Sequence, residues 1–349
     1  MIVNGKTYRT VWFEGDAIKI IDQNRLPFSF EILSLPDVEA ACDAIVKMHV
    51  RGAGAIGAVA GYAMALAFKN TDKNNLPAAL EAKRKIEGTR PTARNLFYAT
   101  EKVWEAGLEG GYEQAISMAE NLADENVAEA LAIAEHGEPL ITDGSAVMTH
   151  CNAGWLGFVD WGSALAPLFL AHRKGKRIFV YVSETRPRLQ GARLTAWELA
   201  NEGIPHTVIP DGASAYIMQQ RKVHAIITGA DRITLNGDTA NKIGTLDKAI
   251  LARHFGIPFY VAAPISTFDF KCLDGSNIVI EHRNEDEVLY ATGWHEAGKQ
   301  LTIRLVTPGS QAMNPAFDVT PAQLIHGFIT SQGIIKPNEI PIKLKQRHD

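Results

Sequence analysis

Four short apolar runs in the second half of the chain end in polar or reactive side chains. These ends are residues 149–154, 183–187, 210–212 and 229–232. Ligands of open parallel sheets bind beyond the carboxyl ends of the strands, so we expect the four ends to line one active-site crevice. A cysteine at the first end and an aspartate at the fourth would supply a reactive thiolate and a general acid there.

Cys151 is the reactive side chain of the first end. The Asn-Ala-Gly that follows it opens a turn whose backbone N–H groups can point at a ligand and stabilise a thiolate. A buried, inert cysteine is the alternative and the commoner role. His150 precedes it, but neighbouring strand residues face opposite sides, which disfavours a direct pair between these two side chains. Cys42, in a predicted helix, and Cys272, in a polar loop, are assigned no role.

Asp231 follows the apolar run AIITGA and precedes Arg232, a position that favours a partly buried carboxyl. Burial would raise its pKa and suit it to general acid catalysis, whereas a helix-cap or turn residue is the alternative. Further along, Lys242 lies near a predicted helix start. There it would hold a phosphate together with backbone N–H groups.

A glycine-rich segment, RGAGAIG at residues 51–57, formally matches the GxGxxG pattern. Dinucleotide binding requires a strand before this pattern, but a helical pattern precedes it and a helix follows, so NAD binding is disfavoured. Small residues here would instead let a ligand approach a helix N-terminus, with Arg51 available to a phosphate. Arg90 lies near the start of another predicted helix and offers a second arginine. The alternative for both arginines is a surface ion pair.

The elements before residue 140 predict an α+β domain. TYRTVWF and AIKII read as strands that flank a hairpin turn at residues 14–16, and a third strand segment, FSFEILSL, follows. Apolar residues then change to a helical period. Helices are expected at about 38–48, 55–69, 77–87, 92–106 and 112–135, and the last of them is the expected bridge between domains.

After residue 140, short apolar strands alternate with helices. We expect strands at 146–151, 177–182, 206–209, 223–228 and 259–262 and helices near 163–173, 193–202, 213–220 and 244–255. This alternation predicts an α/β fold with a parallel, doubly wound sheet. The predicted domains are residues 1–125, with an antiparallel sheet and helices, and residues 126–349, which hold the catalytic sheet.

Composition excludes several classes of protein. The 349 residues are 46% apolar and 21% charged, which is ordinary for a globular protein, and the length predicts two domains. A net charge of −4 argues against binding nucleic acid or anionic membranes through bulk charge. An anionic ligand must therefore be held by a few local groups.

The cysteines and the N-terminus predict a cytoplasmic protein. Three widely spaced cysteines without a CxxC pair fit a reducing compartment rather than a disulfide framework or a structural zinc site. The first ten residues lack the apolar core of a signal peptide. The longest weakly polar run, at residues 55–68, is 14 residues long, whereas a membrane span needs about 20.

Seven motifs, in order along the chain, resemble those of the methylthioribose-1-phosphate isomerases. They are RGAGAIG, TRPTARNL, THCNAG, ETRPRLQGARLTAWEL, GADRITLNGDTANKIGT, PFYVAAP and NPAFDVTP. The same superfamily contains ribose-1,5-bisphosphate isomerases, 5-deoxyribose-1-phosphate isomerases and regulatory subunits of the eukaryotic initiation-factor nucleotide exchanger. The resemblance implies a small α+β domain, a Rossmann-like catalytic domain and a homodimer.

The resemblance also implies roles for single residues. Cys151 matches the catalytic cysteine of the family, and Asp231 matches its proton donor. The residues that match substrate-binding positions are Arg51, Gly52, Ala53, Arg90, Gln190, Asn241 and Lys242. Five of these nine are also candidates from the residues themselves, namely Cys151, Asp231, Lys242, Arg51 and Arg90. Gln190 is not, because it lies in a loop that is recognisable only as polar.

The implied reaction is an aldose–ketose isomerisation in methionine salvage. The anomeric oxygen of the substrate carries phosphate, so the sugar cannot open spontaneously to a free aldehyde, and Asp231 would protonate the ring oxygen. Hydrogen must then move from C2 to C1, with Cys151 relaying a proton or stabilising the transition state. A direct hydride shift is the competing route. Neither route demands a metal or a redox cofactor, so we expect none.

Two departures from the family pattern stand out: one predicts a looser Arg51 loop, and the other concerns the substrate's 5-substituent. Gly54 stands where the family usually has proline, and Trp155, Phe158 and Trp161 stand where small residues are common. These aromatic side chains would either line the pocket or pack in the core. The open alternatives are a 5-deoxyribose-1-phosphate isomerase, a non-catalytic regulatory subunit that binds sugar phosphates and, least favoured, a nicotinamide oxidoreductase.

Overall fold

The computed structural model describes residues 1–69, 76–90, 93–295 and 298–344. The chain forms two compact units: Met1–Glu135 with Ala153–Leu170, and His136–Asn152 with Ala171–Asp349. The domain boundary predicted between residues 125 and 126 lies inside helix α4 (Arg94–Gly137). Residues 153–170 belong to the first unit although they follow this boundary, and a single boundary cannot represent that return. The division into domains 1–125 and 126–349 stays a prediction.

The first unit contains the predicted antiparallel sheet. Its strands are β3 (Val11–Glu14), β4 (Ala17–Ile21) and β5 (Ile32–Leu35), paired in that order. Gly15 and Asp16 join β3 to β4 with φ angles of 59° and 68°, the left-handed pair that a two-residue hairpin turn requires. The predicted hairpin is confirmed.

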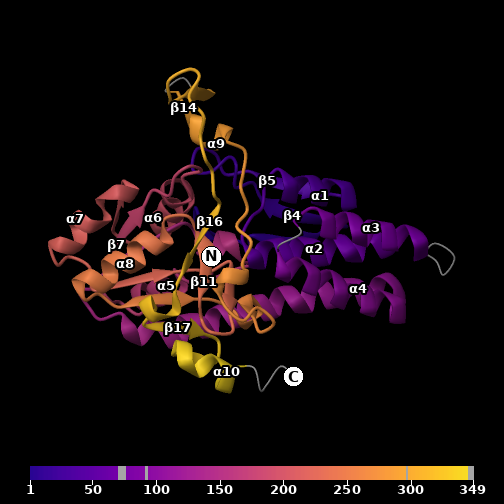
Figure 1. The fold of residues 1–349 in the computed structure, drawn as a ribbon. Helices are drawn as coiled ribbons and strands as arrows, with labels where there is room; N and C mark the ends of the chain where they lie inside the picture. The colour runs from indigo at the N-terminus through magenta and orange to yellow at the C-terminus, as the bar shows by residue number, and fades with distance from the viewer. Residues whose placement is uncertain (70–75, 91–92, 296–297, 345–349) are drawn as a thin grey trace. The chain divides into compact units, whose positions relative to one another are not determined.

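The described part of the first unit also contains the helices α1 (Val38–Val46), α2 (Ala53–Phe68), α3 (Leu76–Gly88) and α4 (Figure 1). Nearly every residue of α2 is buried because its alanines and glycines let neighbouring elements approach closely. Helix α4 is interrupted at Gly110 and Gly111, whose backbone angles are non-helical. This break corresponds to the separate helices predicted at 92–106 and 112–135, although residue 92 lies outside the described residues.

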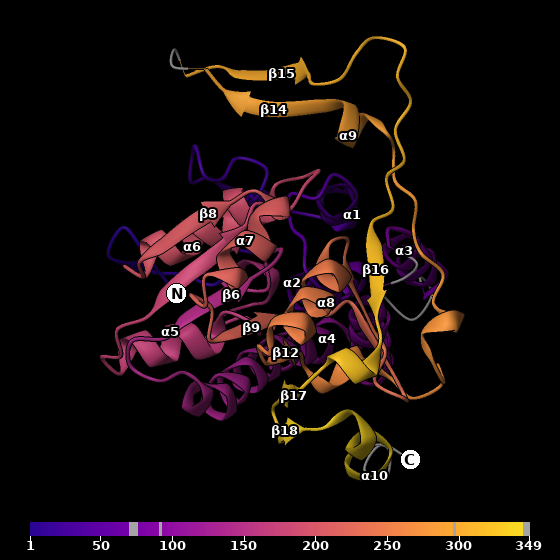
Figure 2. The ribbon, with the colours of Figure 1, turned by 60° about the vertical axis from the view of Figure 1, so that its left-hand side comes forward.

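The second unit is built on a seven-stranded sheet (Figure 2) in the order β18-β17-β12-β9-β6-β7-β8. The strands are β6 (Ala146–Thr149), β7 (Phe179–Ser183), β8 (His206–Ile209), β9 (Ala225–Thr228), β12 (Phe259–Ala262), β17 (Gly327–Thr330) and β18 (Gly333–Ile335). All neighbours pair in parallel except β18, which is antiparallel to β17. The chain runs outward from β6 to β8 and then crosses back to β9 and β12, so the predicted doubly wound α/β sheet is confirmed.

The second unit also contains helices and a smaller sheet. The helices α6 (Ala196–Asn201), α7 (Ser214–Gln219) and α8 (Thr245–Phe255) fall near predicted positions, as does α5 (Ala166–Arg173), which begins in the first unit and ends in the second. A four-stranded sheet has the order β13 (Phe268–Asp269), β10 (Arg232–Thr234), β11 (Thr239–Lys242) and β16 (Phe317–Thr320). A separate hairpin joins β14 (Tyr290–Trp294) to β15 (Gln300–Arg304). No helix within the described ranges combines the length and apolar character that a membrane span requires.

Candidate active site

The polar strand ends predicted from the sequence meet at the switch point of the large sheet. Strand β6 pairs in parallel with β7 on one side and with β9 on the other, and β7 pairs with β8. Their carboxyl ends therefore lie along one edge. Cys151 follows β6 and Asp231 follows β9, the two strands between which the direction of winding reverses. Ligands of doubly wound sheets bind at this point.

Cys151 is held by its main chain. Its φ angle is 63°, in the left-handed region. Its N–H donates to Thr185 Oγ1 at 2.9 Å, and its carbonyl accepts from Thr195 Oγ1 at 2.7 Å. The residue is partly exposed, so it is not the buried cysteine of the alternative.

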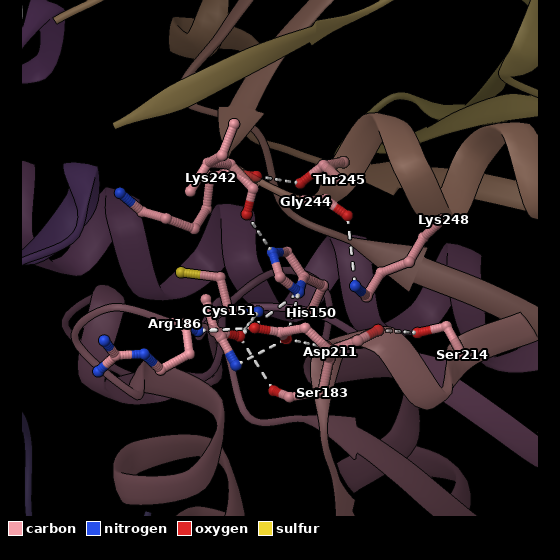
Figure 3. A network of polar contacts seen from close by, with 12 residues as sticks. His150, Cys151, Ser183, Arg186, Asp211, Ser214, Lys242, Gly244, Thr245 and Lys248 are labelled. Carbon is pink, nitrogen blue, oxygen red and sulfur yellow. Dashed lines mark hydrogen bonds and ion pairs between the residues drawn. The ribbon is translucent and has the colours of Figure 1, made fainter. Parts of the chain in front are cut away.

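His150 is buried and braces the neighbouring loop rather than the thiol. Its Nε2 lies 2.8 Å from the Ile243 carbonyl, which can only accept, so this nitrogen carries the proton. Burial, and then the nearby Lys248 ammonium, lower the pKa of His150 to about 3, so the ring is neutral at pH 7. Figure 3 shows the imidazole and the Cys151 thiol pointing in different directions. The expectation that these side chains do not pair is confirmed.

Asp211 organises the end of the neighbouring strand. Its Oδ1 accepts from the Thr185 N–H at 2.9 Å and from the Ser183 hydroxyl, and its Oδ2 accepts from the Arg186 N–H at 2.7 Å. Burial alone would raise the pKa of Asp211, but these hydrogen bonds stabilise the carboxylate and lower it. The ionised side chain thereby fixes the loop that follows β7.

Asp231 differs from the sequence-based expectation. Its side chain is exposed, so the predicted partial burial of its carboxyl is wrong. The reason is local: the residue lies in the short connection from β9 to β10, where its N–H donates to the Ala240 carbonyl at 2.9 Å. Continuing the β10–β11 register by one residue places Asp231 opposite Asn241. The carboxyl is accessible to a substrate.

Lys242 connects the two candidate catalytic residues electrostatically. The side chain is buried, and its ammonium donates to the Ala316 carbonyl at 2.7 Å and lies 4.6 Å from the centre of the Phe317 ring. Burial lowers the pKa of Lys242, whereas the charges of Cys151 and Asp231 oppose this decrease. Cys151 and Asp231 therefore both lie within electrostatic range of Lys242. Figure 3 shows the Cys151 sulfur and the Lys242 ammonium on the same side of the imidazole.

The start of α8 is already occupied by a carboxylate. Asp318 accepts from the N–H of Gly244 at 2.6 Å and from the N–H of Leu246 at 3.1 Å. The sequence predicts that Lys242 holds a phosphate together with N–H groups of this helix start. The N–H groups of Gly244 and Leu246 do not fit that expectation, because Asp318 already binds them. Asn241 is also buried and donates from its side-chain amide to Thr245 Oγ1 at 3.0 Å.

Gln190 presents a buried acceptor that suits a ligand hydroxyl. The side chain is only 5% exposed, and its amide oxygen has no hydrogen-bond partner among the described residues. An unsatisfied buried acceptor costs about 1–3 kcal/mol, which a ligand hydroxyl would recover. The residue precedes a π-helical turn, Gly191–Thr195, and no spacing rule finds such a turn in a sequence, so reasoning from the residues missed it.

The remaining predicted binding residues lie in the first unit. Arg51, Gly52 and Ala53 form the start of α2, with Gly52 as N-cap at a φ angle of 90°. A β-carbon on Gly52 would lie 2.3 Å from the Gly157 Cα, so glycine is required there. Arg90 follows α3. Helix α1 precedes this segment, as expected, so the strand that a dinucleotide fingerprint needs is replaced by a helix.

The two departures from the family pattern meet in the structure, because Gly54 packs against Phe158. A β-carbon on Gly54 would lie 2.8 Å from the Phe158 ring and 2.8 Å from the Asn126 amide. Trp155 and Phe158 are buried, whereas Trp161 is partly exposed. Phe158 thus occupies the space that a side chain at position 54 needs, and for Trp155 and Phe158 the core-packing alternative describes the structure.

Gly54→Ala is expected to destabilise the protein by about 1–3 kcal/mol, because the added methyl overpacks against Phe158. In a Phe158→Ala background the same change should cost at least about 1 kcal/mol less. Urea unfolding of the four proteins of this double-mutant cycle measures the difference. Gly61→Ala, in the same helix with its nearest neighbours at 3.7 Å, is the control and should be neutral or stabilising. Additive losses would contradict the steric coupling.

Comparisons with known proteins find similar chains over nearly the whole length of this one. The family model described as the initiation factor 2 subunit family matches residues 49–337. A methylthioribose-1-phosphate isomerase of Methylocella silvestris is 47% identical, covering 97% of this chain and 96% of its own length. The structure of 5-methylthioribose 1-phosphate isomerase from Pyrococcus horikoshii OT3 has a TM-score of 0.88 and 37% identity, over 98% of this chain and 97% of that one. A structure named translation initiation factor eIF-2B, subunit delta, from A. fulgidus has a TM-score of 0.84 and 38% identity, over 97% and 100%.

Proposed function

We propose that Cys151 and Asp231 perform the reaction of this chain, which belongs to the methylthioribose-1-phosphate isomerases of the initiation factor 2 subunit family. The enzyme converts 5-methylthioribose 1-phosphate into 5-methylthioribulose 1-phosphate, a step of methionine salvage. The observation that carries the assignment is their position: Cys151 follows β6 and Asp231 follows β9, the two paired strands at the switch point of the sheet.

Asp231 is proposed as the general acid that opens the sugar ring. The phosphate on the anomeric oxygen prevents spontaneous opening, so the ring oxygen must receive a proton as the C1–O bond breaks. An exposed carboxyl at the edge of the sheet is accessible to that oxygen. A positioned acid of this kind contributes about 10²–10⁴-fold to a rate.

Cys151 is proposed to act at the C1–C2 bond of the opened sugar. Hydrogen moves from C2 to C1, so C2 becomes a carbonyl carbon while C1 is reduced, and no external oxidant is consumed. The left-handed turn at Cys151 places its sulfur within electrostatic range of the Lys242 ammonium. A thiolate and this ammonium would attract each other in a partly buried site.

Substrate binding is proposed for the remaining residues of the site. Gln190 would accept from a sugar hydroxyl, because its buried amide oxygen needs a donor. Asn241 and Lys242 would bind the sugar phosphate from the end of β11. In the first unit, binding roles are proposed for Arg51, Gly52, Ala53 and Arg90, since guanidinium groups suit phosphate.

The assembly and compartment are proposed as a homodimer in the cytoplasm. The three free cysteines support a reducing compartment. The homodimer is supported by the family resemblance.

A panel of three sugar phosphates tests the proposed substrate. Methylthioribose 1-phosphate should have the highest kcat/KM, and 5-deoxyribose 1-phosphate about 10–200-fold less because it lacks the apolar methylthio group. Ribose 1,5-bisphosphate should be the poorest, since a second dianion is costly to desolvate. Ketose formation is followed by NMR. Faster turnover of 5-deoxyribose 1-phosphate would make that sugar the proposed substrate instead. No ketose from any of the three sugars would favour a non-catalytic subunit, and the A. fulgidus structure is named as a translation initiation factor subunit.

A further inference from the structure

We propose that Thr185 and Thr195 are positioning residues that hold the main chain of Cys151 in its reactive, left-handed conformation. Each hydroxyl meets one main-chain group of Cys151: Thr185 accepts from its N–H, and Thr195 donates to its carbonyl. This inference rests on the proposed catalytic role of Cys151, and neither threonine is among the residues that the resemblance marks as catalytic or substrate-binding.

The conformation of Cys151 needs such support. The left-handed region is unfavourable for a residue with a side chain, and such residues persist where the surroundings fix them. With a φ angle of 63°, Cys151 turns out of the line of β6, and its sulfur faces away from the His150 imidazole. A relaxed main chain at this position would redirect the sulfur.

Thr185 is itself rigidly held. Its φ angle is 66°, unusual for a β-branched residue. Its N–H is bound by the Asp211 carboxylate at 2.9 Å, and its hydroxyl donates to the Ser183 carbonyl at 2.9 Å while accepting from Cys151. The hydroxyl proton is thus directed away from Cys151, which leaves a lone pair for the cysteine N–H. Two left-handed residues from adjacent strand ends are thereby joined.

Thr195 is held from the opposite side by a buried polar chain. The side-chain amide of Asn152 donates to Thr195 Oγ1 at 3.1 Å and to Glu198 Oε1 at 2.7 Å. Thr195 and Glu198 are both 0% exposed, so these bonds form without competition from solvent. Because Thr195 accepts from the amide, its own proton is free to bond the Cys151 carbonyl.

The π-helical turn places Thr195 at this distance. A β-carbon on Gly191, the first residue of the turn, would lie 1.8 Å from the Ser183 carbonyl oxygen, so glycine lets the turn pack directly on the end of β7. A π-turn inserts an extra residue into a helix and is frequent at functional sites. Here the turn begins directly after Gln190 and ends at Thr195, whose hydroxyl reaches the Cys151 carbonyl.

Thr185→Val and Thr195→Val test the proposal, since valine keeps the shape and removes the hydroxyl. Each variant should lower kcat at least tenfold with little change in KM. In each variant, alkylation of Cys151 by iodoacetamide should be slower than in the wild type, or its rate should depend differently on pH. Peptide mass spectrometry follows the reaction, and Cys272 in the same molecule serves as an unchanged reference. Thr185→Ser and Thr195→Ser should restore most of both readouts.

The matched control is Thr228→Val. Thr228 is a fully buried threonine at the end of β9 whose hydroxyl has no partner among the described residues, and its variant should keep the activity and alkylation profile of the wild type. Alkylation is read without turnover, so it tests the positioning even if Cys151 proves not to be catalytic. Wild-type kcat and alkylation in both valine variants would overturn the proposal. If one variant does not fold, the other valine variant decides.

Discussion

Cys151→Ser is expected to lower kcat by about 10³-fold, a loss of about 4 kcal/mol of transition-state stabilisation. Serine fills nearly the same volume and keeps both main-chain hydrogen bonds to Thr185 and Thr195. It cannot supply a thiolate, because an alcohol ionises only at far higher pH. Steady-state kinetics with methylthioribose 1-phosphate measures the loss.

Two controls separate this loss from unfolding. The thermal midpoint of Cys151→Ser should stay close to that of the wild type, because the side chain is partly exposed and forms no part of the core. Cys272→Ser removes another partly exposed thiol and should keep wild-type kcat. If Cys151→Ser retained more than half of the wild-type kcat, the assignment of the cysteine would be wrong.

Asp231→Asn is expected to lower kcat by about 10²–10³-fold, because the isosteric amide cannot protonate the ring oxygen. Stability should change little, since the carboxyl is exposed and its main-chain bond to Ala240 is kept. Kinetics and urea unfolding of the same preparation measure both quantities.

Asp247→Asn is the matched control for Asp231. Asp247 is an exposed aspartate of the same unit, in the first turn of α8. Its variant should keep wild-type kcat and lose at most about 1 kcal/mol of stability through the helix dipole. Equal kcat in Asp231→Asn and Asp247→Asn would remove Asp231 from the mechanism.

Much of the catalytic unit is predictable because its signals are local. Apolar runs bounded by glycine and polar residues indicate the strands β6, β7, β8, β9 and β12, and the alternation with helices requires parallel pairing. Parallel pairing then puts all carboxyl ends on one edge. This is why Cys151 and Asp231 were found as candidates from residues alone.

The parts that escaped prediction depend on pairing between distant segments. The four-stranded sheet joins β10 and β11 to β13 and β16, and residues 153–170 return to the first unit after β6. Short strands of two to four residues carry little periodicity. The exposure of Asp231 and the burial of Gln190 follow from these non-local contacts and from a π-turn, which no spacing rule encodes.

The central claim is that this chain isomerises methylthioribose 1-phosphate through Cys151 and Asp231. Its most direct test is a ³¹P NMR time course of the full chain with this sugar, run in parallel on the wild type, Cys151→Ser and Asp231→Asn. For the wild type, the signal of phosphate on an anomeric carbon should be replaced by that of phosphate on the primary carbon of the ketose. Both variants should leave the substrate signal nearly unchanged over the same period. An unchanged wild-type spectrum, or conversion by either variant at the wild-type rate, would contradict the account.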